Sequence, residues 1–313
     1  MTVDPQAKTA TSRKVPAQRT PEIRPGAIIR DRFELIAEVG RGGLSSVYKA
    51  RDLVAADAGL HDPIVALKIV VAAPSSDPDI ISLMHREARR LRELVHPNIV
   101  RVFDMDVQGD AHFMIMDFLD GRSLAQALRD APEKRLDTAQ VDRLVTDVSA
   151  ALAFAHSRNI IHADLKPGNV FIERTGHVKL IDFNIAYPAA RPAKITEEDT
   201  VQILGRLGAV TPIYASPQRL TGAEPTEGDD VYSLAVLTYI AITGERPFGK
   251  KTAKDALREE LAPERPEGLS RARWNALRRG LSLDDGLRTP TVTRFADEFT
   301  QTSALSRMKR LID

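Results

Sequence analysis

The chain has 313 residues, enough for two domains or one large two-lobed unit. Its 44 basic residues nearly balance 43 acidic ones, and the resulting net charge of +1 argues against a nucleic-acid or membrane-surface partner. Cysteine is absent, which excludes disulfides and thiol chemistry, and no apolar run suits a membrane span or a secretory signal, so we expect a cytoplasmic protein.

The first 25 residues are rich in proline and poor in apolar side chains, which predicts a disordered tail. From Ile28 the pattern predicts two strands joined by a tight turn that contains Gly40, Gly42 and Gly43. Glycines let backbone N–H groups approach phosphate oxygens closely, although ordinary hairpin turns also use them. Because a strand follows the turn, the dinucleotide-binding and P-loop forms of a glycine motif are excluded.

A polar insert, residues 55–63, leads to the strand IVALKIVV, which Lys68 interrupts. A lysine is costly in such a strand unless it meets an anion. Residues 78–95 are predicted to form a helix whose apolar stripe includes Glu87. We expect Glu87 to pair with Lys68, which would then bind the α and β phosphates of a nucleotide; a surface glutamate is the alternative.

Residues 160–184 read IIHADLKPGNVFIERTGHVKLIDFN and contain the main motif of the chain. Asp164, Lys166 and Asn169 follow in the order of a protein-kinase catalytic loop, and Asp182 comes 18 positions after Asp164. Asp164 would accept the proton of an attacking hydroxyl, and Lys166 would stabilise charge on the transferred phosphoryl group. Asn169 and Asp182 offer the hard oxygen ligands that Mg²⁺ prefers, and Mn²⁺ could replace it. The H-x-D-x-x-x-x-N string alone also occurs by chance.

The rest of the chain is predicted to be mainly helical. Residues 137–158 carry apolar side chains at helical spacing, and VYSLAVLTYIAI is apolar nearly all round, as in a helix buried on every side. Residues 252–301 read as three shorter helices separated by PERPEG and DDGLRTP.

The segments GRGGLSSVYKARD, HPNIVRVFD and SLAVLTYIAITGERPF, together with HADLKPGN, resemble the eukaryotic-like serine/threonine protein kinases, the bacterial branch in particular. The resemblance implies an α+β bilobal protein kinase fold, in which an N-lobe has an antiparallel sheet with one main helix and a C-lobe is mostly helical. We expect a tail at 1–25, the N-lobe at 26–119, the C-lobe at 120–301 and a C-terminal tail at 302–313. The implied reaction transfers the γ-phosphoryl group of ATP to Ser or Thr hydroxyls of proteins, the chain itself included.

The resemblance also implies the nucleotide site. Met116 would be the gatekeeper, and the backbone of Asp117 and Leu119 would bind adenine. The expected nucleotide contacts are Gly40, Gly42, Gly43, Ser45, Val47, Ala66, Lys68, Met116, Asp117, Leu119 and Phe171. An internal stack, anchored by an acid on a buried helix, would comprise Leu91, Val102, His162 and Phe183, with Asp230 as the anchor. Ordinary core packing explains the apolar positions equally well.

The activation loop, residues 185–213, departs from regulated members of that family. Ala163 stands where such kinases carry the arginine that binds a phosphate on this loop. We therefore expect activity that depends little on phosphorylation of the best candidates, Thr196 and Thr200.

Two more positions depart from the family pattern. Asn184 replaces the glycine that usually follows Asp182-Phe183, and asparagine tolerates left-handed φ better than other residues with a side chain. Gln218 replaces a glutamate whose usual partner survives as Arg288. A charge-assisted pair would thereby weaken to a neutral hydrogen bond, with a loss of about 1 kcal/mol.

Two other functions remain open from the sequence. A pseudokinase that binds nucleotide or acts as a scaffold would explain the departures, but it gives no reason to keep every phosphate-binding and metal-binding group. A small-molecule phosphotransferase shares the H-x-D loop but generally lacks the Lys166-Pro167 pair. We expect protein substrates and ATP as partners; regulatory input could come from a further protein or a second copy of the chain.

Overall fold

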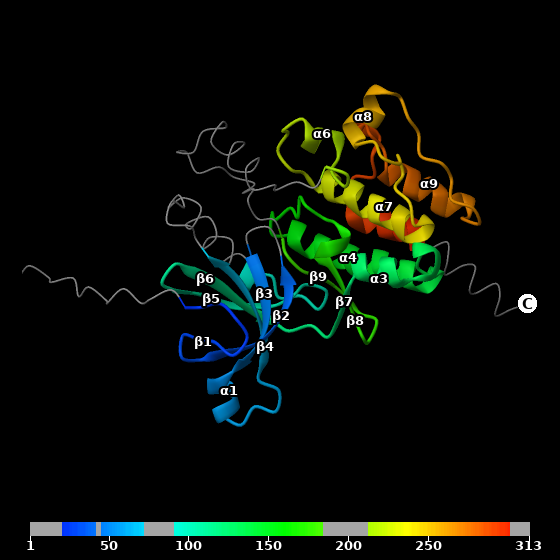
Figure 1. Ribbon diagram of the computed structural model, residues 1–313. Coiled ribbons are helices and arrows are strands. Elements are labelled where there is room, and N and C mark those ends of the chain that lie inside the picture. The colour runs from blue at the N-terminus through cyan, green and yellow to red at the C-terminus, as the bar shows by residue number, and fades with distance from the viewer. Residues whose placement is uncertain (1–20, 42–44, 72–90, 184–211, 301–313) are drawn as a thin grey trace, which may run out of the picture. The chain divides into compact units, whose positions relative to one another are not determined.

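The computed structural model describes residues 21–41, 45–71, 91–183 and 212–300 (Figure 1). The chain divides into two compact units, Met1–Pro78 with Met105–Ile115 and Asp79–Asp104 with Met116–Asp313. Most of the predicted helix at 78–95 lies outside the described residues, although 91–93 are helical. In the parts of the chain that are described, no helix combines the length and apolar character needed to cross a bilayer.

The first unit is built on a six-stranded sheet with the strand order β1-β2-β3-β4-β6-β5. The strand bounds are Ile28–Ile29 (β1), Phe33–Arg41 (β2), Ser45–Asp52 (β3), Ile64–Val71 (β4), Val102–Gln108 (β5) and Ala111–Asp117 (β6). β1 pairs with β2, β2 with β3 and β3 with β4, all antiparallel. The two predicted strands are confirmed by β2 and β3, whereas Gly42 and Gly43 of the predicted turn lie outside the described residues.

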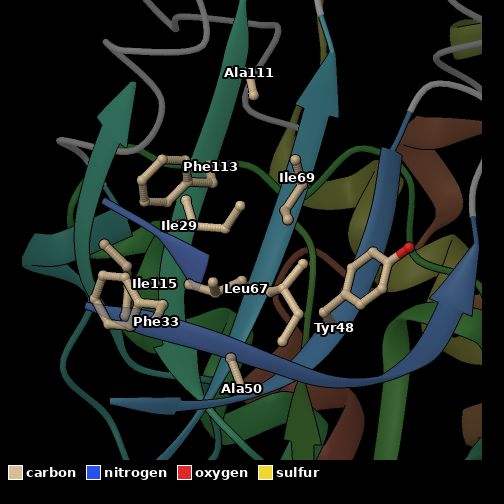
Figure 2. Packing of buried hydrophobic residues seen from close by; sticks show 10 residues of the cluster. Ile29, Phe33, Tyr48, Ala50, Leu67, Ile69, Ala111, Phe113 and Ile115 are labelled. Carbon is tan, nitrogen blue, oxygen red and sulfur yellow. The ribbon is translucent and has the colours of Figure 1, made fainter. Parts of the chain in front are cut away.

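One face of this sheet carries an apolar core, and the side chains in Figure 2 point toward one another from several strands. Alternation along the strands selects this face, because residues two apart lie on the same side. Its members include Phe33, Tyr48, Leu67 and Phe113. The rings of Phe33 and Phe113 pack edge to face with 6.3 Å between their centroids. Burying each of these large side chains contributes about 1.5–3 kcal/mol.

Arg30 connects the two outer strands of the sheet. It follows β1 directly, and its Nε lies 2.8 Å from Oδ2 of Asp106 in β5. Its backbone N–H donates to Oε1 of Gln108, also in β5, over 2.7 Å. β1 and β5 are the opposite ends of the strand order, so these side-chain contacts link the two sheet edges.

The insert between β3 and β4 begins with a helical turn that the sequence analysis did not predict. This turn, α1, spans Leu53–Asp57. Asp52 is its N-cap and accepts a hydrogen bond from the backbone N–H of Ala55 over 3.2 Å. The polarity of the insert concealed the turn, because a five-residue helix is too short to show an apolar stripe.

The second unit is mainly helical, which confirms the α+β fold class. Its helices are α3 (Leu124–Asp130), α4 (Thr138–His156), α6 (Pro217–Leu220), α7 (Glu227–Thr243), α8 (Ala253–Arg258) and α9 (Arg271–Gly280), with residues 292–300 also helical. Short 3₁₀ turns lie at η1 (Pro132–Lys134), η2 (Pro167–Asn169) and η3 (Asp285–Leu287). A three-stranded sheet has the order β7 (Gly121–Ser123), β8 (Val170–Glu173) and β9 (Val178–Leu180).

Caps and burial explain the two longest helices among the described residues. α4 starts at a capping box, in which Asp137 accepts from the backbone of Gln140 and the Gln140 side chain accepts in return. α7 is buried continuously from Asp229 to Ala241, as its apolar sequence predicts. It ends at Gly244, whose φ of 74° favours glycine and whose close backbone neighbours leave no room for a side chain.

Candidate active site

Strand register in the first unit places several of the predicted nucleotide contacts on one face of the sheet. Val47 pairs with Lys68, and Lys49 pairs with Ala66. Directly paired residues share a face, whereas their neighbours Tyr48 and Leu67 belong to the core cluster. Val47, Ala66 and Lys68 therefore face away from the apolar core. The apolar strand carries its lysine because that lysine is on the face opposite the core.

The catalytic-loop residues of the second unit are in direct contact. Lys166 Nζ lies 2.5 Å from Oδ2 of Asp164, and the Asn169 amide nitrogen donates to the Asp164 carbonyl over 2.9 Å. The Asp164 side chain is only 9% exposed, which limits competition from water, while that of Lys166 is 32% exposed. Lys166 and Asn169 follow Asp164 by two and five residues, and they reach it because the chain enters the turn η2 immediately after Lys166.

The two expected metal ligands lie at the same end of one hairpin. Asn169 immediately precedes β8, and Asp182 follows β9 by two residues. β8 and β9 are antiparallel, with Val170 opposite Leu180, and the N–H of Ile181 donates to the Asn169 carbonyl over 2.9 Å. Asp182 is exposed and has a φ of 65°, a strained conformation for a residue with a side chain.

Asp230 holds the catalytic loop from the buried helix α7, which confirms the predicted anchor. Its carboxylate accepts the backbone N–H groups of His162 and Ala163, each over 2.9 Å, and lies 2.8 Å from Nε2 of His156. Burial alone would raise the pKa of Asp230, but the hydrogen bond and charge of His156 help to hold that pKa below its usual range. The two N–H contacts support Ala163 at a φ of 62°.

His162 and Phe183 pack together, as the expected internal stack requires. Their ring centroids are 4.7 Å apart, and both side chains are buried. Leu91 and Val102, the other expected members, are also buried. Burial lowers the pKa of His162, so the neutral imidazole is the form that suits this core.

The predicted adenine-binding segment occupies the end of β6 and the residues after it. The chain passes from the first unit to the second between Ile115 and Met116. The N–H of Asp117 donates to the carbonyl of Arg101 over 3.0 Å. The adenine contacts of Asp117 and Leu119 stay predictions. Phe171 lies in β8, opposite Lys179 of β9.

Several predicted positions lie outside the described residues and stay predictions. Among them are Glu87, Gly42 and Gly43, together with the activation-loop threonines and Asn184. The structure therefore does not test the pairing of Glu87 with Lys68.

Two features near these residues escaped the sequence analysis. Val39 is a 51% exposed valine in the β-bulge beside Gly40, and an exposed apolar side chain next to a glycine turn was the available signal. Asp147 is a buried acid in α4 that accepts the backbone N–H of Val178 over 3.0 Å. An acid among the apolar positions of a core helix was its signal in the sequence.

Gln218 keeps its expected bond to Arg288 and makes a second one. Arg288 Nη2 donates to Oε1 of Gln218 over 2.8 Å, so the predicted neutral hydrogen bond is confirmed. The amide nitrogen of Gln218 donates to the Leu283 carbonyl over 3.0 Å. A glutamate could not make this second bond, because an ionised carboxylate has no proton to donate.

Comparison with known proteins defines the class to which this fold and loop belong. The protein kinase domain family matches residues 33–308, and the chain belongs to that family. The chain is 33% identical over 258 residues to the probable serine/threonine-protein kinase PknB of Lactococcus lactis, covering 79% of this chain and 39% of that protein. It is 34% identical over 263 residues to the serine/threonine-protein kinase PkaA of Streptomyces coelicolor, covering 81% and 47%.

The serine/threonine-protein kinase PrkC of Bacillus subtilis is similar too, at 30% identity over 250 residues, 80% of this chain and 36% of that protein. These relatives are bacterial serine/threonine kinases, which confirms the resemblance inferred from the motifs. The matched region spans less than half the length of each of the three.

Proposed function

We propose that this chain transfers the γ-phosphoryl group of ATP to serine and threonine hydroxyls of proteins, including its own. The contact that most supports this proposal joins Lys166 Nζ to the Asp164 carboxylate at 2.5 Å, with Asn169 bonded to the same loop. Family membership supports it independently. We propose that this reaction takes place in the cytoplasm.

The proposed mechanism assigns a separate task to each side chain of the loop. Asp164 orients the substrate hydroxyl and accepts its proton as the oxygen attacks the γ-phosphorus. Lys166 then stabilises the negative charge that develops on the transferred group, and its contact with Asp164 keeps its ammonium at that place. The bond from phosphorus to the β–γ bridging oxygen breaks, and ADP leaves with that oxygen.

Asn169 and Asp182 fit the binding of Mg²⁺ by their chemistry. The Asn169 amide nitrogen is occupied by the Asp164 carbonyl, which leaves the amide oxygen as its metal-binding atom. Asp182 is an exposed carboxylate at the same end of the hairpin, and both oxygens are hard ligands. When bound, Mg²⁺ neutralises charge on the phosphates; Mn²⁺ should substitute because it accepts the same ligands.

The residues that we assign to nucleotide binding come from both units of the chain. We assign Lys68, with Glu87 as its partner, to the α and β phosphates, and the glycine turn with Ser45 to the phosphate oxygens. Val47, Ala66, Met116 and Phe171 would contact the base, together with the backbone of Asp117 and Leu119. We add Val39 to the apolar contacts because it is an exposed valine beside Gly40.

We further propose that the activity depends little on phosphorylation of the activation loop. Ala163 has no side chain that could bind a phosphate, and the hydrogen bond from its backbone to Asp230 holds the catalytic loop without one. Replacing both Thr196 and Thr200 by alanine should therefore change the rate less than about 100-fold. A larger fall would contradict this part of the proposal.

Incubation of the purified chain with labelled ATP and Mg²⁺ tests the proposed function. The wild type should incorporate label on serine or threonine, whereas Asp164→Asn and Asp182→Ala should lose at least about 10²-fold in rate. Asp130→Asn is a matched control, because Asp130 is an exposed acid of the same unit whose carboxylate pairs with Arg122. This control should retain wild-type activity.

The remaining outcomes separate the alternatives. Equal labelling of wild type and Asp182→Ala would indicate a contaminating kinase. No labelling, combined with ATP binding in calorimetry, would favour a nucleotide-binding scaffold. Transfer to a small molecule without any labelled phosphoserine or phosphothreonine would favour a small-molecule phosphotransferase.

A further inference from the structure

Strand β9 is the last strand of its sheet, but its outer side is not bare. β8 pairs with one side, and on the other side the N–H of Leu180 donates to the Asn98 carbonyl over 2.8 Å. The N–H of Val100 donates to the Leu180 carbonyl over 2.9 Å. These backbone contacts hold the end of β9 that leads to Asp182.

The start of β9 is held by two side chains instead. The Asn98 amide nitrogen donates to the Val178 carbonyl over 2.9 Å, and the N–H of Val178 donates to Oδ2 of Asp147 over 3.0 Å. Both backbone groups of Val178 on this side are therefore satisfied by polar side chains. Unpaired, they would each cost roughly 1–3 kcal/mol on burial.

Asp147 is an unusual choice for its place in α4. It is 7% exposed, and its neighbours on both sides along the buried face of the helix are apolar. In the described parts of the chain, no ion pair involves its carboxylate, and Val178 supplies its hydrogen bond. A buried carboxylate without a cation is costly, so stability alone does not explain it.

The position of β9 matters because the strand leads directly to an expected metal ligand. Asp182 comes two residues after Leu180 and has a φ of 65°, and such strain persists only where the surroundings determine the backbone. The neighbouring Ile181 is bonded to Asn169, the other expected metal ligand. A shift of β9 would therefore move one ligand against the other.

We propose that Asp147 is a positioning residue, whose carboxylate fixes β9 on α4 through the Val178 N–H and so sets the placement of Asp182 for metal binding. This inference rests on the proposed function. Asp147 acts through the strand and touches neither nucleotide nor metal.

The test compares Asp147→Ala, which removes the acceptor, with Asp147→Asn, which keeps an acceptor oxygen but no charge. Ser149→Ala is the matched control, since Ser149 is buried two residues away in α4 and its hydroxyl has no hydrogen-bond partner in the described residues. Three quantities are measured at a temperature at which every variant is folded. They are the amide hydrogen exchange of Val178, the Mg²⁺ concentration for half-maximal binding of ATP, and kcat with KM for ATP.

We expect Asp147→Ala to speed exchange at Val178 at least about tenfold and to raise the half-maximal Mg²⁺ concentration at least about fivefold. Its kcat should fall about tenfold or more while KM for ATP changes less than about threefold, because the strand positions the metal ligand and not the adenine contacts. Asp147→Asn should stay within about threefold of wild type throughout, and Ser149→Ala should match wild type.

Unchanged exchange at Val178, an unchanged Mg²⁺ requirement, or equal damage by alanine and asparagine would each overturn the proposal. If Asp147→Ala does not fold, Asp147→Leu repeats the test with the volume retained. A wild type that transfers no phosphate contradicts the proposed function instead. The exchange and the Mg²⁺-dependent binding of ATP are read without turnover, and they still decide the role of Asp147 in that case.

Discussion

Replacing Gln218 by glutamate, the residue usual in this family, should destabilise the chain rather than strengthen it. The amide of Gln218 accepts from Arg288 and donates to the Leu283 carbonyl. Glutamate would improve the first contact and abolish the second. The outcome depends on which of the two changes is larger.

The stability gained by the charge-assisted bond is limited, because the Arg288 guanidinium already has other hydrogen-bond and charge partners. Its side chain is 1% exposed, and it donates to the carbonyls of Ser282 and Gly228 and lies 3.8 Å from the Asp229 carboxylate. Burial lowers the pKa of Arg288, and Asp229 opposes that shift. A charge-assisted bond in place of a neutral one adds about 1 kcal/mol in such a setting.

The loss comes from the Leu283 carbonyl. It would lose its donor, which lies 3.0 Å away, and a carboxylate oxygen would take that donor's place. The Leu283 carbonyl is partly buried, and an acceptor left without a donor there costs about 1–3 kcal/mol. The two changes together predict that Gln218→Glu lowers the free energy of unfolding by about 1 kcal/mol.

Urea unfolding followed by tryptophan fluorescence measures this difference in the relevant unit, because the one tryptophan of the chain is Trp274 in α9. Gln218→Met serves as the reference that removes both hydrogen bonds, and it should be the less stable of the two variants. An increase in stability of 1 kcal/mol or more for Gln218→Glu would refute the reasoning, because the charge would then outweigh the lost donor.

Three further predictions concern other parts of the fold. Gly280→Ala should cost about 1–3 kcal/mol in the Trp274 assay, since a Cβ would lie 2.8 Å from the Phe295 ring. Burial lowers the pKa of His162 in the folded chain, so on acidification the unfolded chain takes up a proton at a higher pH than the folded chain does. The free energy of unfolding should therefore fall as the pH drops below about 6.5. His162→Phe should remove this pH dependence of the unfolding midpoint. Val39→Asp should weaken ATP binding about tenfold in calorimetry, because it puts a charge at a proposed apolar contact of the nucleotide. The unfolding midpoint should not change, because the Val39 side chain is 51% exposed.

The catalytic loop and the main helices were predictable because their signals are local. Asp164, Lys166 and Asn169 lie within six residues, so a turn is enough to bring them together. The continuous apolar sequence of α7 likewise predicts burial on every side. The order of the motifs then identified the family, because its members carry the same residues in the same order along the chain.

Contacts between distant segments were not predictable from the sequence. Asp147 and Val178 are 31 positions apart, and no periodicity relates a side chain in a helix to one backbone N–H of a strand. Gln218 appeared to be a weakened partner, because the donor it supplies to Leu283 depends on a loop 65 positions away. Such pairings follow from tertiary packing, and local propensity gives no signal for them.

The contacts of Arg30 have a practical consequence for shortened versions of this protein. A chain that starts at Arg32 would lack both β1 and the arginine that reaches Asp106 and Gln108. The peptide groups of β2 that pair with β1 would then be open to other molecules, and open strand edges promote lateral association. Shortened chains used for crystallisation or screening should therefore retain everything from Ile28 onward, or they will tend to self-associate into oligomers.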